Sequence, residues 1–157
     1  MSHQYFLGAD IGTTAIKAAL FDEQGRKVLH HAQEYTLLKP DAQRVEQIPH
    51  VYWETFQACV KKVVQDSKID PEQIKAFSMD SSAETIVFLD EKMEPLDNFY
   101  VWLDSRASIE AEEINHHFTA EEILHATGQT PIDPCYPAAK IALSLIHISE
   151  PTRRVVI

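Results

Sequence analysis

The stretch Gly8-Ala9-Asp10-Ile11-Gly12-Thr13-Thr14-Ala15-Ile16-Lys17 decides how this sequence folds. It joins two apolar runs, residues 5–11 and 15–21, through a Gly-Thr-Thr turn, and this pattern predicts two paired antiparallel strands. Further along, Asp22-Glu23-Gln24-Gly25 predicts a second hairpin turn, with Gly25 at positive φ, followed by a third strand over residues 28–35. The amino end therefore predicts three antiparallel strands.

The remainder of the chain alternates helical and strand patterns. Pro49 suits the first turn of a helix, and one apolar face follows at helical spacing: Tyr52, Phe56, Cys59, Val60, Val63 and Val64. A capped turn at residues 70–73 precedes predicted strands through residues 76–79, 85–89 and 100–102. A helical face runs from Ala107, and a capping box of Thr119 and Glu122 starts a helix that Gly128 ends. This order predicts an α/β fold, a mixed sheet covered by helices.

Composition narrows the classes of partner. The chain has 157 residues, 45% hydrophobic, which suits one globular domain, and its formal net charge of −10 repels nucleic acid and anionic membranes. Two distant cysteines indicate neither a disulfide framework nor a zinc site, and the adjacent histidine pairs at residues 30–31 and 116–117 make poor chelates. No signal peptide or membrane span is evident, so we expect a cytoplasmic protein.

The Gly-Thr-Thr turn has the chemistry of a phosphate site. Gly12 allows close backbone approach, while backbone N–H groups and the hydroxyls of Thr13 and Thr14 supply neutral donors. Asp10 could hold Mg²⁺ through water, and Lys17 could reach a phosphate oxygen. The alternative is an ordinary hairpin with a polar tip, because short glycine motifs have a high false-positive rate.

These residues also resemble a known motif. Asp10 to Thr14 with Lys17 resemble the first phosphate motif of the actin, chaperone and sugar-kinase superfamily, whose fold resembles ribonuclease H. Three later segments resemble the FGGY carbohydrate kinases in particular: Val45-Glu46-Gln47-Ile48-Pro49 with Trp53, Ser82-Ala83-Glu84-Thr85, and Val101 to Ala107. The likeness runs from about Tyr5 to Ile141 in family order.

The resemblance implies an ATP-dependent carbohydrate kinase that uses Mg²⁺ and a small sugar substrate. Residues matching the nucleotide-phosphate loop are Asp10, Gly12, Thr13, Thr14 and Lys17, and those matching the sugar-binding stretches are Ala83, Glu84, Trp102 and Asp104. Two of the latter also fit purely structural roles, since Trp102 could be core and Asp104 could pair with Arg106 or cap a helix. No part of this chain resembles the family's general base or its adenine-binding domain, so we expect this truncated chain to be inactive alone. We expect the full-length enzyme to be a possible homo-oligomer.

Two departures bear on the substrate. At the positions where the resemblance to the glycerol kinases of this family implies an Arg-Glu pair, this chain has Ala83-Glu84. Where it implies a tyrosine, this chain has Cys135. Losing both donors argues against glycerol. Ala83 is not a clean match to the xylulose-type pentulose kinases either, and the leading expectation is a pentulose such as xylulose, or a related sugar or sugar alcohol. The remaining alternatives are a chaperone-like or actin-like ATPase, supported by the first motif alone, and a non-catalytic sugar- or nucleotide-binding module.

The last residues differ in character from the rest. Ser144 to Arg154 resemble a translated sequencing-library adapter, so we expect a partial kinase domain over residues 1–141 and a non-native tail over residues 142–157. The alternative is a real helix ended by Pro151.

Overall fold

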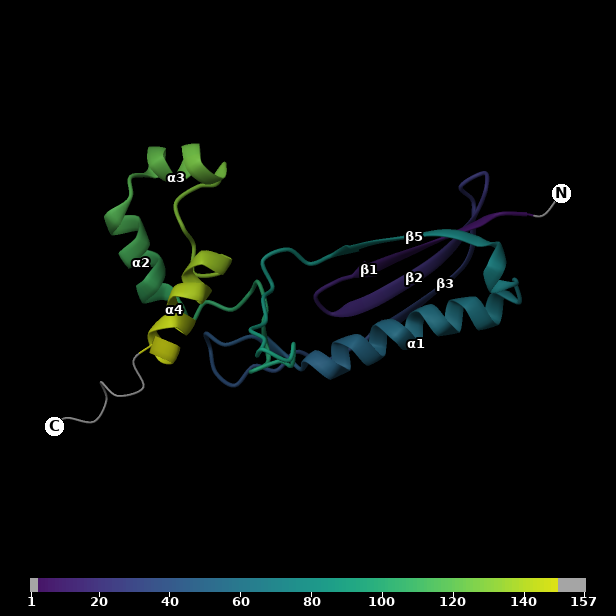
Figure 1. Cartoon of the computed structure of the whole chain (residues 1–157), viewed down its shortest axis with the longest axis horizontal. Helices are drawn as coiled ribbons and strands as arrows, with labels where there is room; N and C mark the ends of the chain where they lie inside the picture. The colour runs from purple at the N-terminus through teal and green to yellow at the C-terminus, as the bar shows by residue number, and fades with distance from the viewer. Residues whose placement is uncertain (1–2, 150–157) are drawn as a thin grey trace. The chain divides into compact units, whose positions relative to one another are not determined.

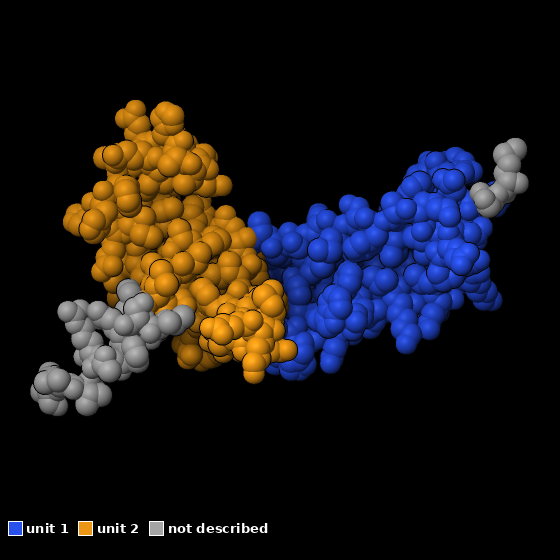
Figure 2. Space-filling view, viewed as in Figure 1, with its two compact units in different colours: residues 1–37, 47–83 blue, residues 38–46, 84–157 orange. Residues whose placement is uncertain are grey.

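The computed structural model describes residues 3–149. The chain divides into two compact units, shown in Figure 2. The first unit comprises residues 1–37 and 47–83, and the second comprises residues 38–46 and 84–157. Each unit has a buried apolar cluster of its own.

A four-stranded mixed sheet forms the centre of the first unit (Figure 1). The strands are β1 (Tyr5–Ile11), β2 (Ala15–Asp22), β3 (Lys27–Glu34) and β5 (Ile74–Ser81), in the order β3-β2-β1-β5. The first three are antiparallel as predicted, and β5 runs parallel to β1. The turn between β2 and β3 forms because the Asp22 carboxylate accepts two backbone N–H bonds and Gly25 has a φ of 75°.

The core of the first unit lies on one face of this sheet. Alternation along β1 and β2 turns Leu7, Ile11, Ile16, Ala18 and Leu20 toward the same side, where they pack against Cys59 and Val63 of helix α1 (Pro49–Ser67). Figure 1 shows α1 running along the sheet. The predicted helical face is therefore confirmed, and the intervening residues Gly8, Asp10 and Lys17 lie on the opposite face of the sheet.

The predicted start of α1 and the predicted capped turn are both confirmed. Pro49 occupies the first turn of α1, and Lys68 ends the helix in the left-handed region with a φ of 57°. The short 3₁₀ helix η1 (Pro71–Gln73) follows, with the Asp70 side chain accepting the Glu72 N–H at 3.0 Å. These caps satisfy backbone groups that the helix ends leave unpaired.

Strand β5 is open along one side. Within residues 3–149 it pairs with β1 only, so its other edge carries no neighbouring strand. Phe77 and Met79 of β5 are 47% and 57% exposed, although their register partners Leu7 and Ala9 are buried. Apolar side chains therefore remain uncovered on this part of the sheet face, beside α1, where Phe56 contacts Phe77 edge-to-face.

The second unit combines a minimal sheet with three helices. Strand β4 (Glu46–Gln47), whose Glu46 belongs to this unit, pairs with β6 (Phe99–Tyr100). The helices are α2 (Ser108–His117), α3 (Ala120–Thr127) and α4 (Pro137–Ser149), and their small core consists of Ala107, Ala111 and Ala139 with Ile132 and Leu143. No helix among the described residues combines the length and the apolar character needed to cross a bilayer.

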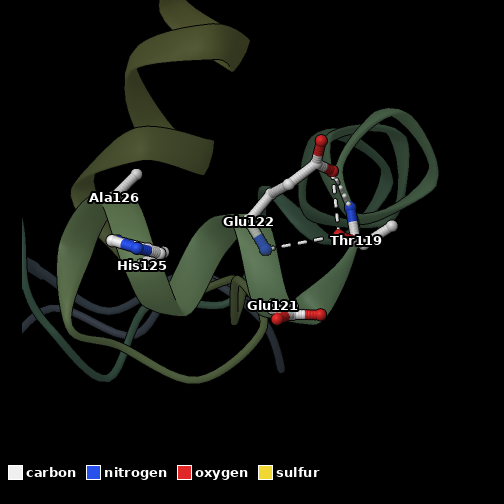
Figure 3. A pocket seen from close by; sticks show the side chains of 5 residues that line it. All are labelled: Thr119, Glu121, Glu122, His125 and Ala126. Carbon is white, nitrogen blue, oxygen red and sulfur yellow. Dashed lines mark hydrogen bonds between the residues drawn. The ribbon is translucent and has the colours of Figure 1, made fainter.

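The predicted capping box of α3 is present in full. Thr119 accepts the Glu122 N–H through its hydroxyl, and Glu122 accepts the Thr119 N–H through its carboxylate, at 3.2 Å and 2.8 Å (Figure 3). Gly128 ends the helix with a φ of 73°, as predicted. The hollow drawn in Figure 3 is lined by residues of this capped helix alone, and its capping carboxylate is already engaged.

The predicted strand over residues 85–89 is wrong. The segment makes isolated bridges between Ile86 and Tyr100 and between Leu89 and Pro95. The reason is a tight turn, in which the Asp90 carboxylate accepts the N–H groups of Lys92 and Glu94 and prevents a continuous ladder. The predicted strand over residues 100–102 is likewise shortened to β6, because the Asp104 N–H donates to the Val101 carbonyl and turns the chain.

Candidate functional site

Asp10 and Lys17 face each other across β1 and β2. They are register partners, and Lys17 Nζ lies 2.9 Å from Asp10 Oδ2. Both side chains are about half exposed on the sheet face opposite α1, because strand alternation buries Ile11 and Ile16 on the other side. The structure thus brings the predicted metal-holding carboxylate and the predicted phosphate-binding cation together.

The bend between the two strands is held by backbone bonds and by one tyrosine. Gly12 N–H donates to the Ala15 carbonyl at 3.0 Å, the Tyr35 hydroxyl donates to the Gly12 carbonyl, and Tyr35 N–H donates to the Thr14 carbonyl at 3.1 Å. A Cβ at Gly12 would lie 3.0 Å from the Ala15 oxygen and 3.6 Å from Asp10 Oδ1. The glycine is therefore required by the tightness of the bend, and it also keeps space open beside Asp10.

Tyr35 belongs to the site although the sequence did not single it out. Its burial raises the pKa of the phenol well above the usual value, and the negative charge of Asp10 adds to this effect. The hydroxyl therefore keeps its proton and acts as a donor to the bend. Tyr52 packs edge-to-face on Tyr35 at 5.5 Å, and burial raises its pKa as well.

Ser82 is a second residue that sequence reasoning did not assign to this bend. Its Oγ lies 3.2 Å from Thr13 Oγ1, and its N–H donates to the Ile11 carbonyl at 3.0 Å. Ser82 lies beside Thr13 because β1 and β5 pair in parallel, and the carboxyl ends of neighbouring parallel strands meet at one edge of a sheet, where ligands commonly bind. Hydroxyl groups from both strand ends therefore gather at the bend.

A shallow groove of about 330 Å³ lies along the exposed sheet face next to Asp10. Its lining includes the cations Lys17 and Lys27, the imidazole of His30 and the carboxylate of Asp10. Such clustering contrasts with the formal net charge of −10 for the whole chain. Of these side chains Lys17 lies beside the bend, whereas Lys27 and His30 pair with Phe21 and Ala19 further along β2. A cation next to the neutral donors of the bend favours an anionic ligand there.

In the second unit, Glu84 adopts an unusual backbone conformation. Its φ is 62°, in the left-handed region that costs a residue with a side chain about 1 kcal/mol or more. Its carbonyl accepts a bond from Lys140 Nζ at 3.3 Å. Ala83, the preceding residue, is exposed and is the last residue of the first unit. Backbone strain of this kind is concentrated at functional sites.

Trp102 is not a core residue, because it is 41% exposed. Its backbone N–H donates to Thr85 Oγ1 at 3.2 Å, which ties it to the segment that follows Glu84. Flat, partly exposed indole rings are well suited to stack on the carbon face of a sugar. The exposure of Trp102 is therefore compatible with the predicted sugar contact.

Asp104 is fully buried and holds a loop. Its carboxylate accepts Val45 N–H at 2.7 Å and binds Arg106, which also bonds Glu46 and lies over the Tyr100 ring at 4.1 Å. Burial alone would lower the pKa of Arg106, but the bonds to Asp104 and Glu46 raise it above its usual value. The pairing with Arg106, one of the two alternatives for Asp104, is present, and its carboxylate orients the loop that carries Trp102.

Apart from Ala83, which is the last residue of the first unit, the predicted site residues form two groups, one in each unit. Asp10, Gly12, Thr13, Thr14 and Lys17 lie on and beside the β1–β2 bend, and Glu84, Trp102 and Asp104 lie on the loops of the second unit. Lys140, buried in α4, bonds two of these loops and was not predicted. The Nε2 of Gln47 is a buried nitrogen without a partner among residues 3–149; the family-like segment that contains Gln47 assigned no contact to it.

Comparisons with known proteins identify the family of this chain. The N-terminal-domain profile of the FGGY family of carbohydrate kinases matches residues 5–155. A gluconokinase of Bacillus subtilis (strain 168) is 37% identical over 139 residues, covering 88% of this chain and 26% of that protein. A glycerol kinase of Marinomonas sp. (strain MWYL1) is 34% identical over 149 residues, covering 94% of this chain and 30% of that protein.

Solved structures show the same fold. A gluconate kinase from Lactobacillus acidophilus superposes with a TM-score of 0.85 at 28% identity, covering 95% of this chain and 30% of that one. A xylulose kinase from Lactobacillus acidophilus superposes with a TM-score of 0.84 at 28% identity, covering 94% of this chain and 29% of that one. The chain spans 26% to 30% of the length of these relatives. The predicted sugar-kinase fold and the resemblance are confirmed: the chain belongs to the FGGY family of carbohydrate kinases.

Proposed function

We propose that this chain supplies the phosphate-binding bend and part of the sugar site of an ATP-dependent carbohydrate kinase. The observation that carries the proposal is the Asp10–Lys17 pair at 2.9 Å beside the bend of residues 12–14. A carboxylate, a cation and neutral donors side by side are what a metal-bound triphosphate requires. Family membership supports this reading over a chaperone-like or actin-like ATPase.

On this proposal the bend binds the phosphates of ATP. The hydroxyls of Thr13 and Thr14 and the ammonium of Lys17 contact phosphate oxygens, and Gly12 leaves room for their approach. Magnesium would neutralise phosphate charge, and Asp10 would hold it through water. A half-exposed carboxylate fits this role, because Mg²⁺ keeps several waters and needs only one or two protein carboxylates. In the described part of the chain, no group of three or more His, Cys, Asp or Glu side chains could hold a metal ion.

The sugar would contact the second group of residues. Glu84 accepts hydrogen bonds from neighbouring hydroxyls, the indole of Trp102 stacks on the carbon skeleton, and Ala83 leaves space where a larger residue would intrude. Asp104 contributes by orienting its loop, because its carboxylate is fully buried and engaged with Val45 and Arg106.

We propose a substrate larger than glycerol, with a pentulose such as xylulose as the first candidate. The small Ala83 and the half-buried Cys135, whose thiol donates to Asp133, support this because neither offers a strong donor to a compact triol. Gluconate is a second candidate, favoured by the 37% identity to a gluconokinase. The two differ in charge, since gluconate carries a carboxylate and xylulose does not.

The general base that deprotonates the sugar would lie outside these residues. The chain spans 26% of the length of the gluconokinase it resembles. We therefore propose that the 157 residues alone turn over no sugar, because transfer needs a positioned base and a closed ATP site. A non-catalytic binding module remains the alternative, and it predicts binding without turnover in every longer form.

A substrate panel on the longer kinase that contains this segment tests the proposal. ATP consumption would be measured with xylulose, ribulose, gluconate and glycerol, with a no-sugar control. The expected result is sugar-dependent turnover that is greatest with xylulose. Turnover greatest with gluconate would support the second candidate, and the absence of turnover with every sugar would contradict the kinase proposal.

The tail is a separate proposal. We infer that residues 142–157 are not native, on the resemblance of Ser144 to Arg154 to adapter sequence. Residues 150–157 lie outside the described part of the chain, and residues 142–149 belong to α4. Resequencing the genomic locus decides the matter, because an independent read with the same tail would refute the inference.

A further inference from the structure

We propose that Lys140 is a positioning residue that fixes the two loops of the sugar site relative to each other. This inference rests on the proposed function for the assignment of those loops to sugar contact. Lys140 Nζ donates to the Val101 carbonyl at 2.9 Å and to the Glu84 carbonyl at 3.3 Å. One ammonium group thus joins two segments that are far apart in sequence, and both belong to the second unit.

The burial of Lys140 indicates a specific role. The residue is 0% exposed, whereas lysine is almost never fully buried unless its charge is paired. Neither hydrogen-bond partner of Nζ is a carboxylate, since both are backbone carbonyls. Burial lowers the pKa of Lys140, and the nearby charge of Asp104 opposes that effect. An apolar side chain of similar volume would fill this space without the cost of desolvating a charge.

The two carbonyls belong to backbone that needs such support. Glu84 is held at a φ of 62°, and its carbonyl orientation depends on this uncommon conformation. Val101 directly precedes Trp102, and its N–H donates to the Val45 carbonyl at 3.0 Å. Lys140 therefore holds the residue that contributes the carboxylate and the residue next to the indole.

Neighbouring bonds show that these loops act as one small structure. Ile86 and Tyr100 exchange two backbone bonds of 3.1 Å and 2.8 Å, and Trp102 N–H bonds Thr85 Oγ1. Lys140, on α4, adds its two bonds to the carbonyls of Glu84 and Val101 in the same loops. Without its ammonium group, the Glu84 carbonyl would lose this donor and the Val101 carbonyl would keep only the Asp104 N–H at 2.8 Å, so the two loops would be held together less firmly.

The kinetic test uses three variants of the longer kinase that contains this segment. Lys140→Met keeps the length of the side chain and removes its donors, Lys140→Arg keeps the charge, and Lys75→Met is the matched control. Lys75 Nζ also donates to a backbone carbonyl, that of Glu72 at 2.6 Å, but on an exposed strand. We expect Lys140→Met to raise the sugar KM at least about tenfold and to change the ATP KM less than about twofold. The sugar KM of Lys140→Arg should lie between those of the wild type and Lys140→Met, and the sugar KM of Lys75→Met should equal that of the wild type.

A second measurement does not depend on catalysis. Amide hydrogen exchange of the 157-residue chain reports the same loops, and Lys140→Met should speed exchange at Ile86 and Trp102 about tenfold or more. The α3 amides of Ile123 and Gly128 serve as internal controls and should not change. If Lys140→Met does not fold, the inference is tested by the exchange rates of the Ile86 and Trp102 amides in Lys140→Arg instead.

The outcomes separate this inference from the proposed function. Absence of sugar turnover in the wild type contradicts the kinase proposal, while the exchange data still judge Lys140. Unchanged sugar KM together with unchanged exchange at Ile86 and Trp102 overturns the positioning role. A lower kcat with both KM values unchanged also overturns it, because it would place Lys140 in the chemical step.

Discussion

Lys17 Nζ lies 2.9 Å from Asp10 Oδ2, and the two residues are register partners on antiparallel strands at the start of the chain. Both side chains are about half exposed, at 60% and 46%. Exposed ion pairs of this kind contribute between about 0 and 1 kcal/mol to stability. The Asp10–Lys17 pair therefore contributes little to the stability of the fold, and a role in ligand binding explains its presence better.

The first prediction concerns Asp10. In the longer kinase, Asp10→Asn should lower kcat about 100-fold or more, because the metal would lose its carboxylate while the fold keeps its shape. The measurements are ATP consumption with the preferred sugar and the melting temperature. Asp66→Asn is the matched control, since Asp66 forms an equally exposed ion pair with Lys62 at 2.7 Å. Equal kinetics for the two variants would remove Asp10 from the site.

The second prediction compares two glycines of the same hairpin. A Cβ at Gly12 would lie 3.0 Å from the Ala15 oxygen, so Gly12→Ala should lower the free energy of unfolding by about 1–3 kcal/mol. At Gly8 the nearest atom is a Phe21 ring carbon at 3.6 Å, an ordinary contact. Gly8→Ala should change stability by less than about 1 kcal/mol, toward greater stability. Urea unfolding of this chain measures both, and an equal loss in the two variants would contradict the steric argument.

The third prediction concerns the buried charge cluster of the second unit. Arg106→Met leaves the fully buried Asp104 without its cation and should destabilise the chain by about 3–5 kcal/mol. Arg44→Met breaks an exposed pair with Asp41 and should cost less than about 1 kcal/mol. Denaturant unfolding followed by tryptophan fluorescence compares them. Similarly small losses of stability in the two variants would contradict this prediction, because they would mean that water solvates the Asp104 carboxylate in place of Arg106.

The fourth prediction concerns pH. Bonds from the Thr119 N–H and hydroxyl lower the pKa of Glu122, so its capping contribution is present above its unfolded pKa of about 4.3 and is lost as the pH falls through the lower folded value. Glu122→Gln should therefore be less stable than the wild type at pH 7, with a difference that shrinks in acid. Glu121→Gln is the control, because Glu121 lies in the same turn and takes no part in the capping box. A difference independent of pH would refute this assignment.

Local patterns were sufficient for much of the fold. The alternation of β1 and β2, the proline at the start of α1 and the Thr119–Glu122 capping box depend on residues within a few positions of each other, and each was predicted from the sequence. The strand expected over residues 85–89 was not formed, because the Asp90 turn and the left-handed Glu84 outweigh the β propensity of the residues between them.

The site was less predictable, because its supporting residues are distant in sequence. Nothing near Thr13 indicates that Ser82 lies beside it, 69 residues later, and nothing near Glu84 indicates Lys140, 56 residues later. Asp104 shows a different limit of sequence-based prediction. Its motif marked the residue as a candidate, but only the three-dimensional contacts show that its carboxylate is fully buried. Motifs thus selected candidate residues, whereas the contacts of these candidates, and the additional residues Tyr35, Ser82 and Lys140, come from the fold alone.

The uncovered side of β5 has a practical consequence for work with this segment. Among residues 3–149, one edge of β5 has no strand partner, and such an edge next to exposed Phe77 and Met79 is a template for intermolecular β-pairing. Concentration-dependent aggregation of the isolated polypeptide would begin there, opposed mainly by electrostatic repulsion between chains of formal net charge −10. Purification at low ionic strength and alkaline pH preserves that repulsion, and a lysine introduced on β5 would act as a gatekeeper against fibre-like assembly.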